Sequence, residues 1–429
     1  MKPRTPGFWL IVATVGLLAL LPMQTYAGMT PEEVKVFEGY KAKAETGDAA
    51  AQLDLSICFR EGKGVSADFV QAVAWCRRSA VQGYALAQNA LGAHYAMGLG
   101  VAKDMTEGTK WIRMAAEQGL AKAQVNLGMD LLSEQKPDSY GKSLRIDDLS
   151  VSKDAALAVG WFRKAADQGD SLGQGMLGTC YLKGWGVPKD PAQGVSWLMK
   201  GAEQGDPEAQ RNLGTCYYLG EGVAKDEVEA VKWFRKAAGH GNTDAQSNLG
   251  ACYANGTGVA QDMVEAVKWF RKGADRGDAA AQFNLGVCYF NGTGVAQDMV
   301  EAVQWFRKSA EQGDAAAQSN LGGCYSIGSG VAQNHVQAVT WLRKAADQGD
   351  ARAQSNLAVC YFQGLGVEKN YVEAYAYFNL ASSTDEDARN KRGMMEKGMS
   401  PNAISRGQQR TKELQKEIEA KIASKAAGK

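Results

Sequence analysis

The sequence contains very little histidine. His94, His240 and His335 are the only histidines in 429 residues, and no two are close enough in sequence to form a metal-binding pair on one helix. We therefore expect no metal site and no cofactor. His94 occupies a position that other parts of the chain fill with cysteine, and we interpret it as a core residue whose ring nitrogen is hydrogen-bonded.

An excess of charge of one sign is also missing. Lysine and arginine number 48 and aspartate and glutamate 47, so the chain lacks the clustered basic surface from which nucleic-acid binding usually gains its affinity. This balance excludes a nucleic-acid partner. Basic residues gather only from Arg389 onward, and we interpret that tail as a solvated helix face.

Long apolar runs are absent except at the start of the chain. Lys2 and Arg4 precede an apolar stretch from Phe8 to Leu21, and Thr25-Tyr26-Ala27 offers small residues for signal peptidase. We predict a signal peptide over residues 1–27 and an exported chain, periplasmic or secreted, with no transmembrane segment after cleavage. An uncleaved membrane anchor remains the alternative.

A repeat of 36 residues fills most of the chain. Tryptophan recurs at that interval at Trp161, Trp197, Trp233, Trp269, Trp305 and Trp341, and cysteine does so at Cys180, Cys216, Cys252, Cys288, Cys324 and Cys360. Trp75 and Trp111 extend the series, and Tyr377 stands at the ninth position. The gap of 50 residues before Trp161 places a 14-residue insertion within about 129–153.

Each repeat is predicted to form two helices. Apolar residues follow helical spacing in both halves of Asp278–Gly313, and Gly292-Thr293-Gly294 separates the halves. Asp298 with Glu301 three residues later predicts a capping box at the second helix. Because one pair cannot bury its apolar faces alone, pairs must stack. We predict an all-α fold: an α/α superhelical solenoid of nine two-helix repeats over 47–384, with a capping helix over 28–46 and a capping helix and basic tail over 385–429.

These residues resemble the Sel-1-like repeat family of tetratricopeptide-type solenoids, whose pattern is AxxNLGxxYxxGxGVxxDxxxAvxWfrkAAxqG. The resemblance covers residues from about 48 to 384, and only the insertion departs from it. It implies a curved superhelix that acts as an adaptor or scaffold, in bacteria often exported and engaged with cell-envelope or host partners.

Catalytic motifs are few. One branch of the family carries two cysteines per repeat and includes members reported to act on penicillins, which the single cysteine column here does not match. Ser133-Glu134-Gln135-Lys136 and Ser139-Tyr140-Gly141-Lys142 fit SxxK, but the companion SDN and KTG motifs are absent. We therefore predict that the protein is not an enzyme, with a β-lactamase-like repeat enzyme acting on penicillin-type or peptidoglycan substrates as the alternative.

Only Cys58 and Cys76, in the first repeat, could form a disulfide.

A partner surface is predicted from the positions that vary between repeats. In the first helices these positions are spaced i, i+4, i+7, and first helices line the concave surface of such stacks. Aromatic residues there would anchor a protein or peptide partner. The alternative is that these positions vary because they are unselected surface or are partly buried in the stack. The predicted partner-binding residues are Arg211, Tyr218, Phe283, Val287, Phe290, Val359 and Phe362. The sequence thus predicts an exported adaptor that binds a protein or peptide of the cell envelope or a host in its groove.

Overall fold

The computed structural model describes residues 29–133 and 153–427, and every regular element within them is a helix. The helices are α2 (Pro31–Glu45), α3 (Ala49–Glu61), α4 (Phe69–Val81), α5 (Ala85–Met97), α6 (Met105–Glu117), α7 (Ala121–Ser133), α8 (Lys153–Asp167), α9 (Ser171–Lys183), α10 (Pro191–Glu203), α11 (Pro207–Leu219), α12 (Glu227–Gly239), α13 (Thr243–Asn255), α14 (Met263–Asp275), α15 (Ala279–Asn291), α16 (Met299–Glu311), α17 (Ala315–Ile327), α18 (His335–Ala346), α19 (Ala351–Gln363), α20 (Tyr371–Ala381), α21 (Glu386–Glu396) and α22 (Pro401–Ala427). The predicted all-helical solenoid of two-helix repeats is confirmed.

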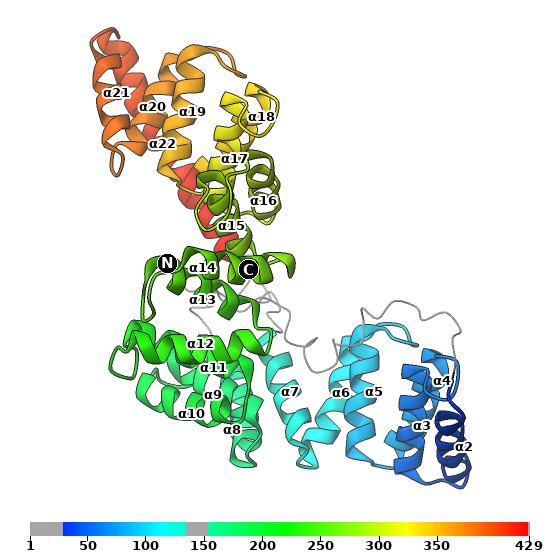
Figure 1. Cartoon of the computed structure of the whole chain (residues 1–429). Coiled ribbons are helices and arrows are strands. Elements are labelled where there is room, and N and C mark those ends of the chain that lie inside the picture. Colours follow the sequence, from blue (N-terminus) through cyan, green and yellow to red (C-terminus); the bar gives the residue numbers. More distant parts are fainter. Residues whose placement is uncertain (1–28, 134–152, 428–429) are drawn as a thin grey trace. The chain divides into compact units, whose positions relative to one another are not determined.

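The helices alternate between a first and a second helix of each repeat, and the chain divides into two units (Figure 1). One unit holds residues 1–213 and 221–224, and the other holds residues 214–220 and 225–429. Within each unit a second helix packs against the first helix of its own repeat and against the first helix of the next, as α14 does with α13 and α15. The contacts are therefore local, as expected of a solenoid.

Aspartate and glycine set the ends of the helices. The Asp298 side chain accepts the Glu301 N–H at 3.0 Å and so caps α16. The Asp298 N–H, however, donates to the Tyr289 carbonyl at 2.9 Å, so it is already satisfied by the first helix of the repeat. The predicted capping box is thus wrong in its second half, because the glutamate side chain has no free N–H to accept. Gly292 ends α15 at a φ of 67°.

The core of a repeat combines glycine on the first helix with a large side chain on the second. A Cβ on Gly286 would lie 2.7 Å from Phe306 Cδ1 and 3.3 Å from the Ala302 carbonyl oxygen. Phe306 is 1% exposed, and Leu285 on the same helix as Gly286 is fully buried. The small-residue columns therefore make room for a phenyl ring as well as for a close approach of two backbones.

The ends of the chain are covered by additional helices. Thr30 and Glu33 form a complete capping box at the start of α2, which packs on α3. At the other end α22 packs on α20, where a Cβ on Gly407 would lie 2.4 Å from Tyr375 Cδ1. The short helix α21, which the sequence analysis did not separate from its neighbour, lies between them in sequence and also contacts α20. No helix among the described residues is long and apolar enough to cross a membrane.

Candidate functional site

The predicted partner-binding residues lie at different depths. Arg211 is only 9% exposed, and its Nη2 donates to Glu208 Oε2 at 2.7 Å. Ser247, Ser319 and Ser355, at the equivalent position of later repeats, are also buried. This column therefore lies in the junction between repeats, unlike the exposed position expected of it, because helix packing brings the next repeat over it.

The other predicted residues are accessible to a larger extent. Tyr218 is 37% exposed and Phe362 39% exposed, whereas Val287 and Val359 are half-buried. Phe283 and Phe290 are half-buried because both contact the ring of Phe306, with centroids 6.0 and 6.2 Å apart. Part of the surface of each of these two rings is therefore buried against the core, and the rest is accessible to solvent.

The first helices of the second unit share one accessible face, which we call the open face. It consists of three half-buried or exposed positions per helix, spaced i, i+3, i+6: Asn248, Ala251 and Ala254 on α13; Asn284, Val287 and Phe290 on α15; Asn320, Gly323 and Ser326 on α17; and Asn356, Val359 and Phe362 on α19. A Cβ on Gly323 would meet nothing within 4 Å, so the face is open to solvent at its centre.

The asparagine column of the open face was missed by the sequence analysis. That analysis selected positions that vary between repeats, whereas Asn248, Asn284, Asn320 and Asn356 do not vary. The signal that could have found them is a constant polar residue next to the buried leucine of each first helix. A constant residue is often structural, so only its hydrogen bonds can distinguish the two roles.

A second amide column, of glutamines, has the structural role. Gln282 Nε2 donates to the Ala274 carbonyl at 3.1 Å, and its Oε1 accepts Gln312 Nε2 at 2.8 Å. Gln282 is 5% exposed and thereby joins α14, α15 and α16. Gln318 makes the same two bonds with Ala310 and Gln348. These amides are fully engaged in holding the stack together.

The tryptophans of the second helices pack into the core or against it, as their spacing predicted, and Trp75, Trp111, Trp161, Trp197 and Trp269 are only half-buried. Trp233, Trp305 and Trp341 are 5 to 8% exposed. A lysine three residues later lies over each ring, as Lys308 Nζ does 3.9 Å from the Trp305 centroid. The rings are therefore covered by their own helix rather than offered to a ligand.

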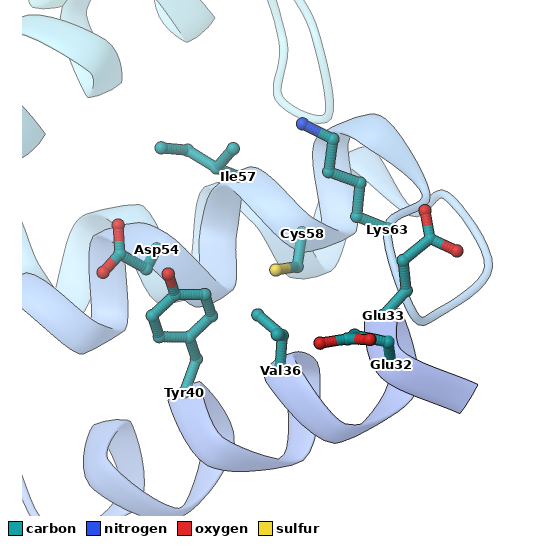
Figure 2. A pocket seen from close by; sticks show the side chains of 8 residues that line it. All are labelled: Glu32, Glu33, Val36, Tyr40, Asp54, Ile57, Cys58 and Lys63. Atoms are coloured by element: carbon teal, nitrogen blue, oxygen red, sulfur yellow. The ribbon is translucent and has the colours of Figure 1, made fainter. Parts of the chain in front are cut away.

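A cavity of about 260 Å³ lies between α2 and α3 in the first repeat (Figure 2). Figure 2 shows Glu32 and Glu33 at its one end, Val36 and Cys58 in the middle, and Tyr40 beside Asp54 at the other end, where Ile57 also lines it. Burial raises the pKa of Asp54, and the charge of Asp48 raises it further. The rim of the cavity carries the carboxylates Glu32, Glu33 and Asp54 together with the ammonium group of Lys63, and no histidine lines it.

The cysteine column provides no activated nucleophile. All eight cysteines are buried and none forms a disulfide, including Cys58 and Cys76, and Cys76 Sγ donates to the Ala87 carbonyl at 3.3 Å. Burial raises the pKa of Cys180 to about 12 and that of Cys252 to about 11, so both are protonated at neutral pH. His94 in this column is 5% exposed, and its Nδ1 lies 2.9 Å from the Leu99 carbonyl, which confirms the predicted core role.

Two groups of predictions fall wholly or partly outside the described residues. The signal peptide over 1–27 does, and so does most of the insertion, since residues 134–152 are not described. Ser139 and both SxxK lysines lie in that range, whereas Ser133 is the last residue of α7. Among the described residues no group of three or more His, Cys, Asp or Glu could hold a metal ion.

Comparison with known proteins identifies the repeat. A family model described as Sel1 repeat matches nine times, over residues 49–84, 85–120, 121–170, 171–206, 207–242, 243–278, 279–314, 315–350 and 351–383. The third match spans 50 residues and so includes the insertion. No curated protein matches the chain.

Two solved structures align with most of the chain. A Sel1 repeat protein from Oxalobacter formigenes is 32% identical, with 80% of this chain and 98% of that chain covered and a TM-score of 0.50. A protective antigen of uropathogenic Escherichia coli strains, which displays the same kind of repeat fold, is also 32% identical. That alignment covers 90% of this chain and 96% of the antigen, with a TM-score of 0.45.

Proposed function

Because the chain belongs to the Sel1 repeat family, whose solenoid is typical of protein-interaction adaptors, we propose that it is an adaptor that binds a protein partner on the open face. The observation that carries this proposal is the contrast between the two sides of the first helices. One side is covered by the second helices, whereas the other leaves Phe362 exposed and Val287, Phe290 and Val359 partly exposed beside amides. Accessible aromatic and aliphatic groups on a rigid scaffold are suited to anchoring a partner.

We also propose that the protein works outside the cytoplasm, in the periplasm or after secretion, with a partner in the cell envelope or on a host. The support for this is the N-terminal pattern of Lys2 and Arg4, the apolar stretch and Thr25-Tyr26-Ala27. Sequencing the N-terminus of the protein recovered from fractionated cells tests it. A mature chain that begins at Gly28 in the exported fraction is expected, and an intact Met1 in the cytoplasmic fraction would contradict export.

Site-specific photo-crosslinking tests the adaptor function directly. A benzophenone amino acid is placed at position 323 on the open face or, as a control, at position 300 on α16. Val300 is 56% exposed and lies on a second helix, so the control position is more accessible than the half-buried position 323 and lies on another surface. Irradiation of the source cells should give a discrete cross-linked protein from position 323 and not from 300. Equal yields from both positions, or none from 323, would refute binding at the open face.

A further inference from the structure

We propose that Asn248, Asn284, Asn320 and Asn356 bind the main chain of an extended peptide segment of the partner, with one amide for about every three peptide residues. This inference rests on the proposed function and specifies its chemistry. A side-chain amide offers one acceptor and two donors, so it can pair with both the N–H and the C=O of a peptide group. Such pairing does not depend on the peptide's side chains.

The first argument is that these side-chain amides have hydrogen-bonding groups that are not used within the protein. Among the described residues the structure records no hydrogen bond to the side chains of Asn248, Asn284 and Asn356. Asn320 Oδ1 accepts Arg352 Nη2 at 3.2 Å, which leaves the two N–H groups of Asn320 available. All four asparagines are half-buried or exposed. Two residues before Asn284 on the same helix, the amide of Gln282 is buried and has both a donor and an acceptor partner.

The second argument is that the chain's own sequence keeps these amides open. In the first unit the same column is engaged, since Asn212 Nδ2 donates to Thr179 Oγ1 at 3.1 Å. Thr179 lies on the first helix of the preceding repeat. In the second unit the equivalent residue is Ala251 before Asn284, Val287 before Asn320 and Gly323 before Asn356, and none of these side chains has a hydrogen-bonding group. The argument does not extend to Asn248, because the residue at that position is Thr215.

The third argument is spacing. Successive first helices touch, because α13 and α15 have Cα atoms within 8 Å of each other, as do α17 and α19. Packed helices run about 8–10 Å apart. An extended chain advances about 3.3 Å per residue, so three residues cover about the same distance. Successive asparagines can therefore meet peptide groups that recur every third residue.

The fourth argument is access. The residue next to the amide on the open face is small in two of the four repeats, Ala251 beside Asn248 and Gly323 beside Asn320, whereas Val287 and Val359 lie beside the other two amides. Since a Cβ at Gly323 would meet nothing within 4 Å, a peptide backbone can approach there. The larger Phe290 and Phe362 lie further along the same face, where they would contact peptide side chains.

The test uses a peptide selected on the protein itself. A phage library of random 12-residue peptides is panned against the full mature chain, and affinities of the recovered peptides are measured by fluorescence polarisation. Replacing Asn284 or Asn320 by alanine should weaken binding about five- to tenfold each, because one pair of hydrogen bonds is lost. The matched control is Gln304→Ala, which removes an exposed amide from the second helix α16 and should leave binding unchanged.

The peptide supplies the complementary test. Methylation of the peptide nitrogen at every third residue should weaken binding about tenfold or more in one of the three registers, whereas single alanine substitutions should cost less. The inference is overturned if Asn284→Ala and Asn320→Ala bind as the wild type does, or if N-methylation is harmless in every register. It is also overturned if panning enriches no more binders on the wild type than on the double alanine variant. Cross-links at position 323 that persist in that variant would leave the adaptor function standing and remove only the amide mechanism.

Discussion

The first helices of the repeats carry glycine and amide side chains on two faces. On one face these residues are packed against other helices, and on the other they are accessible. Gly322 and Gly323 are neighbours on α17, yet a Cβ on Gly322 would lie 2.7 Å from Leu342 Cγ, whereas a Cβ on Gly323 would meet nothing within 4 Å. Gln282 and Asn284 on α15 differ in the same way, since only the glutamine amide is engaged inside the stack. Residue type alone therefore does not tell a packed position from an accessible one.

This difference between the packed face and the open face indicates which property of the protein a substitution on each face should alter. On the packed face every group has a neighbour that must move if the group is altered, so substitutions there act on stability. On the open face the side chains are only partly covered by neighbours, so substitutions there should act more on binding and less on stability. Four predictions follow this contrast, each pairing a packed position with an accessible or better-satisfied one.

The largest effect is expected for phenylalanine. Phe306→Ala removes a 1% exposed ring and should lower the free energy of unfolding by about 3–5 kcal/mol. Phe362→Ala removes a ring that is 39% exposed and contacts Tyr371 at 5.4 Å, and it should cost less than about 1 kcal/mol. Urea unfolding followed by circular dichroism measures both. Equal losses would mean that the two faces are not different.

The amide columns should differ next. Gln282→Ala removes two side-chain hydrogen bonds, although the Ala274 carbonyl keeps the Gly277 N–H and Gln312 keeps the Gly277 carbonyl, so about 1–2 kcal/mol should be lost. Asn284→Ala should change the unfolding free energy by less than about 0.5 kcal/mol. Urea unfolding of both variants measures the two changes in the free energy of unfolding. A large loss for Asn284→Ala would show that the asparagine column is structural.

A pH effect is expected at Asp206, which caps α11 but has no serine hydroxyl beside it, unlike its counterpart Asp278. Ser247 Oγ donates to Asp278, but the equivalent position before Asp206 is Gly175, which has no hydroxyl group. Burial raises the pKa of Asp206 to about 6, and the charges of Glu208 and Asp170 add to it, against the hydrogen bond from the Ala209 N–H.

Since the folded state binds this proton more tightly than the unfolded state, Asp206 lowers stability as the pH rises from about 4 to about 6. Asp206→Asn should therefore stabilise the protein by roughly 2 kcal/mol at pH 7 and by almost nothing below pH 4. Asparagine already caps α13 at the equivalent position, Asn242. Thermal unfolding of both proteins across this range is the measurement, and a gain that does not grow with pH would contradict the assignment.

The smallest effects are expected for the adjacent glycines. Gly322→Ala forces a methyl group against Leu342 and should cost about 1–2 kcal/mol. Gly323→Ala meets nothing and reduces the freedom of the unfolded chain, so it should add about 0.5 kcal/mol. Opposite signs in the two unfolding free energies would confirm the contrast, and equal signs would remove it.

Much of the fold could be predicted from the sequence. The 36-residue interval and helical spacing gave the nine helix pairs, and the buried position of His94 followed from its place in the cysteine column. The capping box at Asp298 failed because the Tyr289 carbonyl takes the N–H that a glutamate would need, a contact across two helices that no local pattern contains. The helix α21 was missed because it is short and lies outside the repeat.

The site was less predictable. Variation between repeats found Phe290, Val359 and Phe362, which lie on the open face, but it also selected Arg211, which lies in a junction. The asparagine column was passed over because it is constant. A constant position and a variable one can both be accessible, so exposure had to be read from packing.

The sequence by itself determined that this protein is a stack of paired helices, because periodic apolar residues must be buried and each pair alone is too small to bury them. It determined the helix ends as well, through aspartate and glycine. Only the tertiary structure decided which amides hold the stack together and which remain open, and which of two adjacent glycines is irreplaceable. Those distinctions depend on which atoms of the next repeat lie opposite each side chain. The spacing of residues along the chain does not reveal which atoms those are.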